Sequence, residues 1–146
     1  MPLPRGGRRT RLFCLAVLLA GCTAPQPAVQ AGSCPAAQGA PMLVFELFFG
    51  RSIHGQGEVS DRAWDDFQEQ VVTPSLPNGY TVFDAAGAWR NPATGHTVHE
   101  RTKVLLAALP DAAASASAVE RIRQTYAEQF HQTLVGMTVA PACGAF

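Results

Sequence analysis

The sequence contains a single lysine, Lys103, and charged residues make up only 15% of its 146 residues. Eleven lysines and arginines balance 11 acidic residues, and no basic cluster lies beyond the N-terminal arginines. Nucleic-acid-binding domains carry a basic face, so this composition argues against a nucleic acid partner. It argues equally against a membrane-binding surface made of charge.

Common catalytic motifs are also missing. The glycine-rich stretch 50–58 has Gln56-Gly57 where a phosphate-binding loop needs Lys and Ser or Thr, and it lacks the order G-x-G-x-x-G. The four histidines do not have the spacing of a metal site, and there is no Gly-x-Ser-x-Gly elbow. We therefore expect no cofactor and no metal, and the sequence indicates no catalytic residue. Arg51, Ser52 and His54 could hold a small anion, although a solvated turn is the simpler interpretation.

Residues 1–21 have the features of a lipoprotein signal peptide. A positive segment precedes the apolar stretch 12–20, which is too short to span a bilayer as a stable helix. Leu19-Ala20-Gly21-Cys22 then resembles the lipobox of bacterial lipoproteins, in which cleavage falls before the cysteine and the thiol is acylated. An ordinary signal peptide with an incidental cysteine is the alternative. We expect a lipid anchor at Cys22 and a periplasm-facing envelope protein; Thr23 favours the outer membrane, by analogy with lipoprotein sorting.

Removal of the signal would take away four arginines and no acidic residue, which leaves a formal charge of −4. Residues 22–41 contain several prolines and no hydrophobic period, so they are predicted to form a flexible tether to a single domain at 42–146. Cys34 and Cys143 are the remaining cysteines, and an oxidising compartment favours a disulfide between them. A metal-binding or catalytic thiol is the alternative, although neither cysteine lies in a Cys-x-x-Cys pair or near a histidine.

The stretch 42–50 is the most hydrophobic one outside the N-terminus and predicts the central strand of the domain. It is too short for a typical helix and is rich in aromatic and branched residues. Alternation would place Leu43, Phe45, Leu47 and Phe49 on one face and Met42, Val44, Glu46 and Phe48 on the other. Both faces are apolar, so we expect both to be covered. Helices can cover the first, and a tail, a partner chain or a ligand would cover the second.

The remaining pattern predicts an α+β fold of the ferredoxin-like βαββαβ type. Right-handed connections would give a four-stranded antiparallel sheet of order 4-1-3-2 with two helices on one face. Cys34 precedes the first strand and Cys143 follows the last, and these positions are neighbours in such a sheet. After the first strand we expect a helix from Asp61 to about Pro74, with an apolar stripe of Trp64, Phe67 and Val71. A strand at 80–85, continued at 89–90 after a bulge at Gly87, and a strand at 97–109 should follow. The last elements are a helix capped by Ser117, with an apolar stripe of Val119, Ile122, Tyr126 and Phe130, and a strand at 134–140 stopped by Pro141.

One polar group is a candidate ligand site; its members are Glu46, Arg51, Arg90, Glu100, Arg101 and Lys103. Val104 and Leu106 favour their own side of the third strand as the helix-covered one. Arg101 and Lys103 would then lie on the open face with Glu46 and could meet an anion. Cross-strand ion pairs on a half-exposed sheet are the alternative interpretation.

Ordered segments of the domain are similar to a family of small bacterial envelope proteins called domain of unknown function 3574. They are Phe49-Gly50-Arg51-Ser52, Val59-Ser60 with Trp64 and Phe67, Val72-Thr73-Pro74, Pro77 to Val82, Gly87 with Trp89-Arg90, Glu100 to Lys103, Pro141-Ala142-Cys143 and Phe146. The resemblance covers about 42–146, and Leu76 departs from it where Phe is expected. It implies a secreted or lipid-anchored protein and supplies no catalytic residue.

These observations favour a non-enzymatic lipoprotein that binds a small molecule or an envelope partner, with a homodimer formed through the open sheet face. A small dimeric enzyme of the monooxygenase or isomerase type, acting in a cavity over that face, is an alternative by fold analogy alone. A structural envelope assembly factor is the other.

Overall fold

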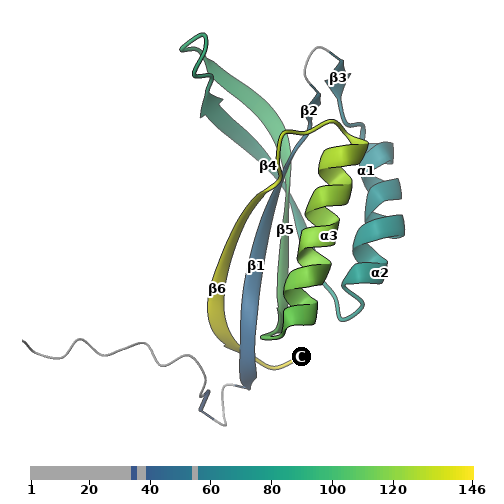
Figure 1. Ribbon diagram of the computed structural model, residues 1–146, viewed down its shortest axis with the longest axis vertical. Coiled ribbons are helices and arrows are strands. Elements are labelled where there is room, and N and C mark those ends of the chain that lie inside the picture. Colours follow the sequence, from purple (N-terminus) through teal and green to yellow (C-terminus); the bar gives the residue numbers. More distant parts are fainter. Residues whose placement is uncertain (1–33, 36–38, 54–55) are drawn as a thin grey trace, which may run out of the picture.

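The computed structural model describes residues 34–35, 39–53 and 56–146 (Figure 1). The signal peptide, Cys22, His54 and most of the tether lie outside these residues. The described part forms one antiparallel sheet with helices on one side, so the α+β class is confirmed. The four long strands are β1 (Ala40–Gly50), β4 (Thr81–Arg90), β5 (Thr97–Pro110) and β6 (Gly136–Gly144).

The sheet order is β4-β5-β1-β6, and all neighbours are antiparallel. Counted along the chain among the four long strands alone, this order reads 4-1-3-2 from β6 to β4; the labels differ because the described residues also contain two short strands. Two short strands, β2 (Ser52–Ile53) and β3 (Gly57–Glu58), pair with each other within the stretch expected to be a loop. Within the large sheet β1 is central, with β5 on one side and β6 on the other.

The first helical segment consists of α1 (Asp61–Phe67), the π-helix η2 (Gln68–Val72) and α2 (Thr73–Ser75). It begins as expected, because the Ser60 hydroxyl accepts a 3.1 Å hydrogen bond from the Ala63 amide. The π turn, with its wider winding, adds Val72 to the core at 0% exposure, and Val71 of the expected stripe is partly buried against the same core. Pro74 does not end the helix, because it occupies the first turn of α2, where its missing N–H is tolerated.

The second helix, α3 (Ala113–Gln129), begins four residues before the expected cap. The Ser117 hydroxyl does not cap it but bonds to the Ala113 carbonyl one turn earlier, at 2.9 Å. The predicted stripe is correct: Val119, Ile122 and Tyr126 are buried, and so is Phe130 just beyond the helix. The two helices therefore lie on the same face of the sheet (Figure 1).

The core lies between the helices and one face of the sheet. Phe45, Leu47 and Phe49 of β1 are at most 4% exposed, so the assignment of that face to the helices is confirmed. Phe49 makes edge-to-face contacts with Trp64, with a centroid distance of 5.2 Å, and with Tyr126, at 4.8 Å. Such aromatic pairs add about 0.5–1.5 kcal/mol each beyond their burial.

Two strands run further than expected. β6 continues through Pro141 to Gly144, because it is an edge strand and a missing N–H on its outer side removes no ladder bond. β4 has no bulge, and Gly87 pairs in register with Glu100. β4 and β5 also pair beyond the last β1 pairing, Gly50 with Thr102. Residues 86–101 thus form a two-stranded arm that projects from the sheet (Figure 1).

Candidate functional site

One face of the sheet is left uncovered by the helices, and we call it the open face. Glu46 belongs to it, and its cross-strand partners Leu106 and Thr138 therefore do as well. By the same pairing the open face includes Phe48, Thr102, Val104, Glu100, Thr81, Phe83, Gly87 and Trp89.

This pairing corrects the prediction for β5. Leu105 and Ala107 are buried under the helices at 0% and 1% exposure, whereas Leu106 is 37% exposed on the open face. Arg101 and Lys103 therefore lie on the helix side and do not join Glu46. The prediction for β5 is wrong because Val104 and Leu106 are the more hydrophobic pair, whereas Leu105 and Ala107 share their face with the long polar side chains of Arg101 and Lys103. Lys103 instead lies over buried Trp64, with its Nζ atom 6.0 Å from the ring centroid.

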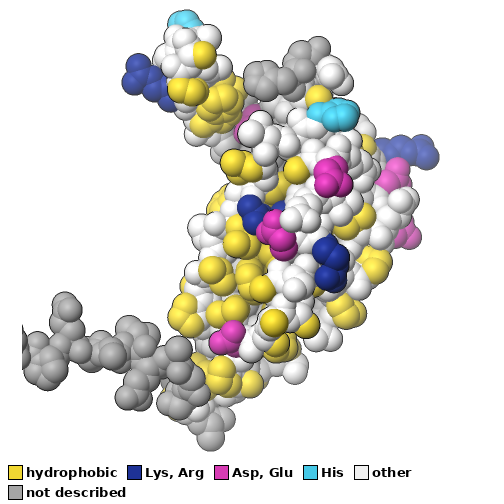
Figure 2. Space-filling model, in the orientation of Figure 1, with side chains coloured by type: hydrophobic (Ala, Val, Ile, Leu, Met, Phe, Trp, Pro, Cys, Tyr) yellow, Lys and Arg dark blue, Asp and Glu magenta, His cyan; other side chains and the backbone are white. Residues whose placement is uncertain are grey.

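The open face carries an aromatic patch made of Phe48, Phe83 and Trp89. Their side chains are 36%, 51% and 41% exposed, although all three come from the strands of the sheet. Hydrophobic side chains also gather on the projecting arm in the space-filling view (Figure 2). Phe48 and Phe83 both pair with Val104, and Trp89 lies six residues further along β4 on the same face. Exposed apolar side chains gathered on one face are typical of interaction surfaces. The sequence analysis expects a tail, a partner chain or a ligand to cover this face of β1, and the helices leave the face exposed.

Two carboxylates lie on the same face. The Glu46 Oε2 atom accepts a 3.2 Å hydrogen bond from the Thr138 hydroxyl on β6. The Glu100 side chain extends from β5 over Gly50 of β1, because a Cβ atom placed on Gly50 would be 2.8 Å from the Glu100 Oε2 atom. Among the described residues the open face carries these acidic groups and neither lysine nor arginine. Its charge fits an uncharged or cationic partner better than an anion.

Arg51 is the most deeply buried charged residue, with 1% of its side chain exposed. Its Nε atom donates to the Val59 carbonyl at 2.8 Å, Nη2 donates to the same oxygen, and Nη1 donates to Asp61 at 2.7 Å. Glu58 lies 3.4 Å from Nε. The hydrogen bond from Arg51, followed by its charge, lowers the pKa of the Asp61 carboxyl below its usual value. Arg51 therefore joins the end of β1 to β3 and to the start of α1, and its donors are used within the fold.

The other predicted cations are also engaged. Arg101 pairs with Glu58 at 3.1 Å and with Asp61 at 3.3 Å, both largely in solvent. Lys103 pairs with Asp84 at 2.6 Å, and this hydrogen bond lowers the pKa of Asp84. Such exposed pairs contribute little to stability.

Arg90 lies away from all of these groups, near the tip of the arm. Its Nε atom donates to the Gly95 carbonyl of the turn at 3.1 Å. The six predicted polar residues are therefore not one cluster: Glu46 and Glu100 share the open face, three cations belong to the helix side, and Arg90 closes a turn.

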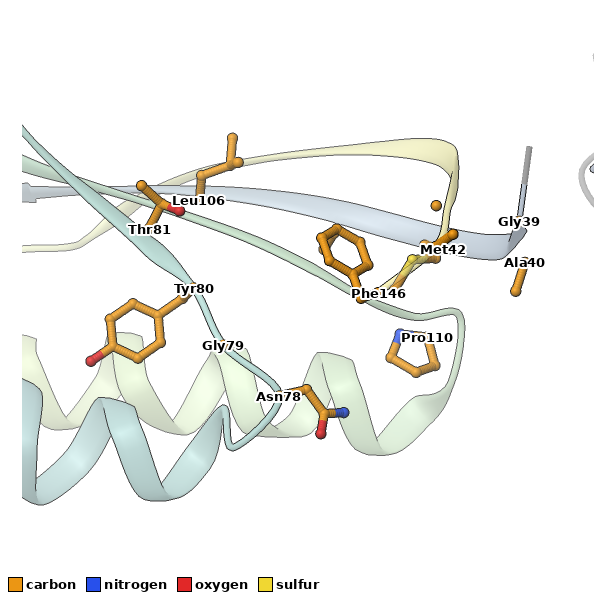
Figure 3. Close-up of a pocket in the computed structure, with 13 residues that line it drawn as sticks. Gly39, Ala40, Met42, Asn78, Gly79, Tyr80, Thr81, Leu106, Pro110 and Phe146 are labelled. Atoms are coloured by element: carbon orange, nitrogen blue, oxygen red, sulfur yellow. The ribbon is translucent and has the colours of Figure 1, made fainter. Parts of the chain in front are cut away.

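A pocket of about 790 Å³ lies at the end of the open face farthest from the arm (Figure 3). Its apolar walls come from Met42 of β1, from Leu106, Ala108 and Pro110 of β5, and from Phe146. Asn78 and Thr81 line the side next to β4. None of the residues that line it has a charged side chain. The sequence alone does not indicate this site: Asn78 and Gly79, within Pro77 to Val82, and Phe146 enter the sequence argument only through the family resemblance.

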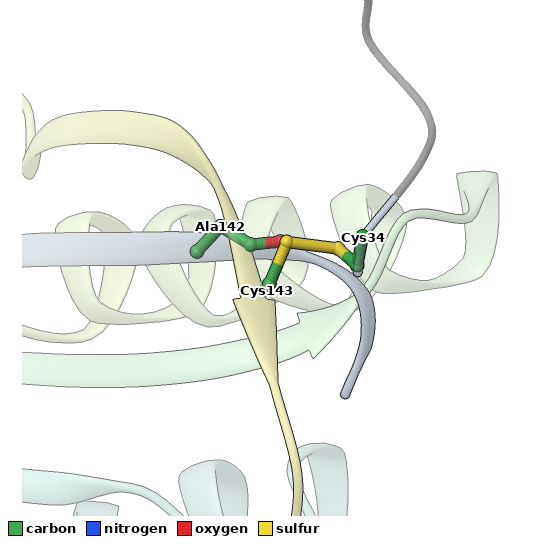
Figure 4. The surroundings of a disulfide bond; sticks show 3 residues. All are labelled: Cys34, Ala142 and Cys143. Carbon is green, nitrogen blue, oxygen red and sulfur yellow. A yellow bond between two sulfur atoms is a disulfide. The ribbon is translucent and has the colours of Figure 1, made fainter. Parts of the chain in front are cut away.

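The predicted disulfide is present and lies beside this pocket. Cys34 and Cys143 are bonded, with 5.7 Å between their Cα atoms (Figure 4). The bond joins the segment before β1 to the end of β6. There Gly39 approaches so closely that a Cβ atom on it would lie 2.0 Å from the Gly144 carbonyl oxygen. The disulfide thus fixes the C-terminal wall of the pocket against the start of β1.

Residues 34–35, 39–53 and 56–146 contain no group of three or more His, Cys, Asp or Glu side chains placed to hold a metal ion. Within the same residues, no helix has the length and hydrophobicity needed to cross a membrane.

Comparison with solved structures shows the fold alone. The chain is similar to a phage SAM lyase in complex with S-methyl-5'-thioadenosine, with a TM-score of 0.54 and 11% identity over 68% of this chain and 80% of that one. It is also similar to a phage SAM lyase in the apo state, with a TM-score of 0.51 and 13% identity over 69% and 81% of the two chains. None of the curated proteins compared matches the sequence.

The family is established by sequence. A family model described as "Protein of unknown function (DUF3574)" matches residues 45–146. This range contains both helical segments and all four long strands, apart from the first residues of β1. The expected resemblance is confirmed, and the chain belongs to the DUF3574 family.

Proposed function

We propose that the protein is a lipid-anchored envelope protein of the bacterial cell that works as a binding module, and that its aromatic patch binds a second copy of the chain. The observation that carries the proposal is the exposure of Phe48, Phe83 and Trp89, between 36% and 51%, on a sheet face that the helices do not cover. A ferredoxin-like arrangement of this sheet and its helices leaves that face free for a partner.

Burial of the patch would supply a useful driving force. A large aromatic side chain buries about 150–250 Å² when fully covered, so these half-exposed residues could together remove several hundred Å² of apolar surface from water across both copies. The arm adds a second reason. An isolated two-stranded hairpin is only marginally stable in water, and residues 86–101 extend beyond the support of β1. Packing of the arm against a second copy would stabilise it.

Charge also favours a second copy over an anionic partner. The open face carries Glu46 and Glu100, whereas the turn of the arm carries Arg90 and His96. In a twofold dimer both copies use the same surface, so each contact between two different residues occurs twice, once in each direction. Two copies related by such an axis could place each arm tip against the acidic body of the partner.

The test compares two exposed apolar residues on opposite faces. Phe83→Ser removes a side chain that is 51% exposed in the aromatic patch, and Val139→Ser removes one that is 49% exposed on the helix side of β6. Sedimentation equilibrium should show a dimer for the wild type and a dissociation constant at least about tenfold larger for Phe83→Ser, a loss of about 1.4 kcal/mol. Val139→Ser should associate like the wild type. A wild type that remains monomeric at high concentration, or equal effects of the two substitutions, would refute the proposal.

The lipid anchor has a separate test. The intact mass of the chain extracted from membranes with detergent should correspond to a start at Cys22 carrying a diacylglyceryl group and a further acyl chain. Cys22→Ser should abolish both the added mass and the release of residues 1–21. A processed chain without lipid would refute the anchor.

A second candidate function is that of a small enzyme acting over the open face. The fold likeness to a phage SAM lyase, over 80% of that chain, is the observation that favours it. Carboxylates without a competing cation on the open face are compatible with a cationic substrate. Titration of the protein with SAM, whose sulfonium group is cationic, in a calorimeter tests it, with Glu46→Gln and Glu100→Gln as variants. Absence of heat at millimolar ligand would remove this candidate.

A further inference from the structure

The pocket beside the disulfide has the chemistry of a site for a hydrocarbon chain. Its volume of about 790 Å³ lies within the range of about 300–1,000 Å³ that is usual for small-molecule sites. The residues that line it carry no charged side chain, so an ionic group buried there would find no side chain of opposite charge. Its walls are formed by methionine, leucine, proline, alanine and phenylalanine side chains.

The shape favours an elongated occupant. Leu106, Ala108 and Pro110 are alternate residues of β5 and all line the pocket. Residues on a strand advance about 3.3 Å each, so these three walls extend over about 13 Å. The polar groups are grouped on one side: the Thr81 hydroxyl and the Asn78 amide come from the chain that leads into β4. An amphiphile with a long apolar part and an uncharged polar group matches this arrangement.

The position of the pocket indicates a source for such a molecule. Gly39 and Ala40 line it, and they follow Cys34, whose disulfide holds the start of the domain at this end. Cys34 lies twelve positions after Cys22, the proposed acylation site. A fully extended chain covers at most about 3.3–3.6 Å per residue, so this end of the domain cannot lie more than about 40 Å from the anchoring cysteine. The opposite end of the open face carries the arm and has no such constraint.

The C-terminal residue supplies a surface that an occupant would cover. Phe146 is 97% exposed although it lines the pocket next to Met42. A Cβ atom on Gly144 would lie 3.1 Å from the Phe146 ring and 2.6 Å from the Met42 sulfur, so the space that both side chains border depends on the absence of a side chain at Gly144. An apolar chain along β5 would be enclosed between them.

We propose that this pocket binds an acyl chain of a membrane lipid, with an uncharged polar group near Asn78 and Thr81. The proposal goes beyond the dimer, and it uses the proposed anchor only as an argument for position. Its test uses residues 23–146, which include every described residue and lack the acylated cysteine, exported to a periplasm.

The probe is N-phenyl-1-naphthylamine, an uncharged dye whose fluorescence rises in apolar surroundings. The wild type should bind it, 1-monopalmitoylglycerol should displace it, and glycerol should not. Leu106→Glu, in the pocket, should weaken dye binding at least tenfold. Val139→Glu is the matched control, because Leu106 and Val139 are 37% and 49% exposed and lie on opposite faces of the sheet. Thermal unfolding of both variants should remain cooperative, and Leu106→Ser, which adds no charge, should weaken binding less than Leu106→Glu.

Two results would overturn the proposal: no dye binding by the wild type, or equal binding by Leu106→Glu and the wild type. Native mass spectrometry then identifies the source of the chain. A lipid mass on the unacylated chain and a further one on the acylated full chain would indicate a separate membrane lipid. A lipid mass on the unacylated chain alone would indicate that the anchor itself fills the pocket of the acylated protein. The same spectra separate this inference from the dimer, because a monomer that carries lipid supports only the pocket and a bare dimer supports only the aromatic patch.

Discussion

Removal of the Cys34–Cys143 disulfide should destabilise the domain strongly. The two cysteines are separated by 109 positions, so the cross-link constrains nearly the whole described chain when it is unfolded. In the chain-entropy model a loop of this length corresponds to about 16 cal/mol/K, or about 5 kcal/mol at 25 °C. For a domain of this size each kcal/mol lowers the melting temperature by about 4 °C, which gives an expected fall of about 20 °C.

The assay is thermal unfolding of Cys34→Ser/Cys143→Ser and of the wild type, each with and without reductant. Reductant should lower the melting temperature of the wild type to that of the double variant and should leave the double variant unchanged. The comparison of the reduced wild type with the double variant separates the loss of the cross-link from the effect of the two new hydroxyl groups. A fall of less than about 5 °C in the double variant would refute the reasoning, because it would mean that the unfolded chain gains little freedom when the bond is absent.

Two further substitutions test the interior. Arg51→Ala should cost about 3 kcal/mol in urea unfolding, because it leaves a cavity and removes the donors to the Val59 carbonyl and Asp61; unchanged stability would show that Arg51 is not the structural link proposed. Tyr126→Phe should cost about 1 kcal/mol, because its hydroxyl donates to the Gly50 carbonyl at 3.0 Å. Burial raises the pKa of Tyr126 above 10, so its contribution is complete below pH 10 and decreases as the pH rises further. The free energy of unfolding, measured from pH 8 to pH 11, should therefore decrease less steeply in Tyr126→Phe than in the wild type. Parallel curves for the two proteins would contradict this.

The sequence by itself determined the parts of this protein that depend on local patterns. The alternation in 42–50 identified the central strand and its helix-covered face, since a two-residue period leaves no other arrangement for Phe45, Leu47 and Phe49. The order of elements and the position of the two cysteines predicted their bond, which the structure contains. The family was also evident from ordered short segments of the sequence.

Local patterns were insufficient where two arrangements were equally good. On β5 both parities mix apolar and polar residues, and only the packing of Leu105 and Ala107 against β1 and the helices decided which side is buried. Lys103 could then reach the helix side because its long stem packs over Trp64 while its amine meets Asp84. The π turn in the first helical segment likewise made Val72 the fully buried residue and left Val71 partly buried beside it.

The candidate sites depended on tertiary structure for a related reason. The pocket joins residues from the start of β1, the loop before β4, the end of β5 and the C-terminus, which are far apart in the sequence and individually unremarkable. The six polar residues show the converse: their chemistry suggested one site, but strand pairing separates them onto two faces and a turn. Sequence patterns specify which side chains alternate or recur along one element, whereas a site is a meeting of several elements, and only the register between strands fixes which residues meet.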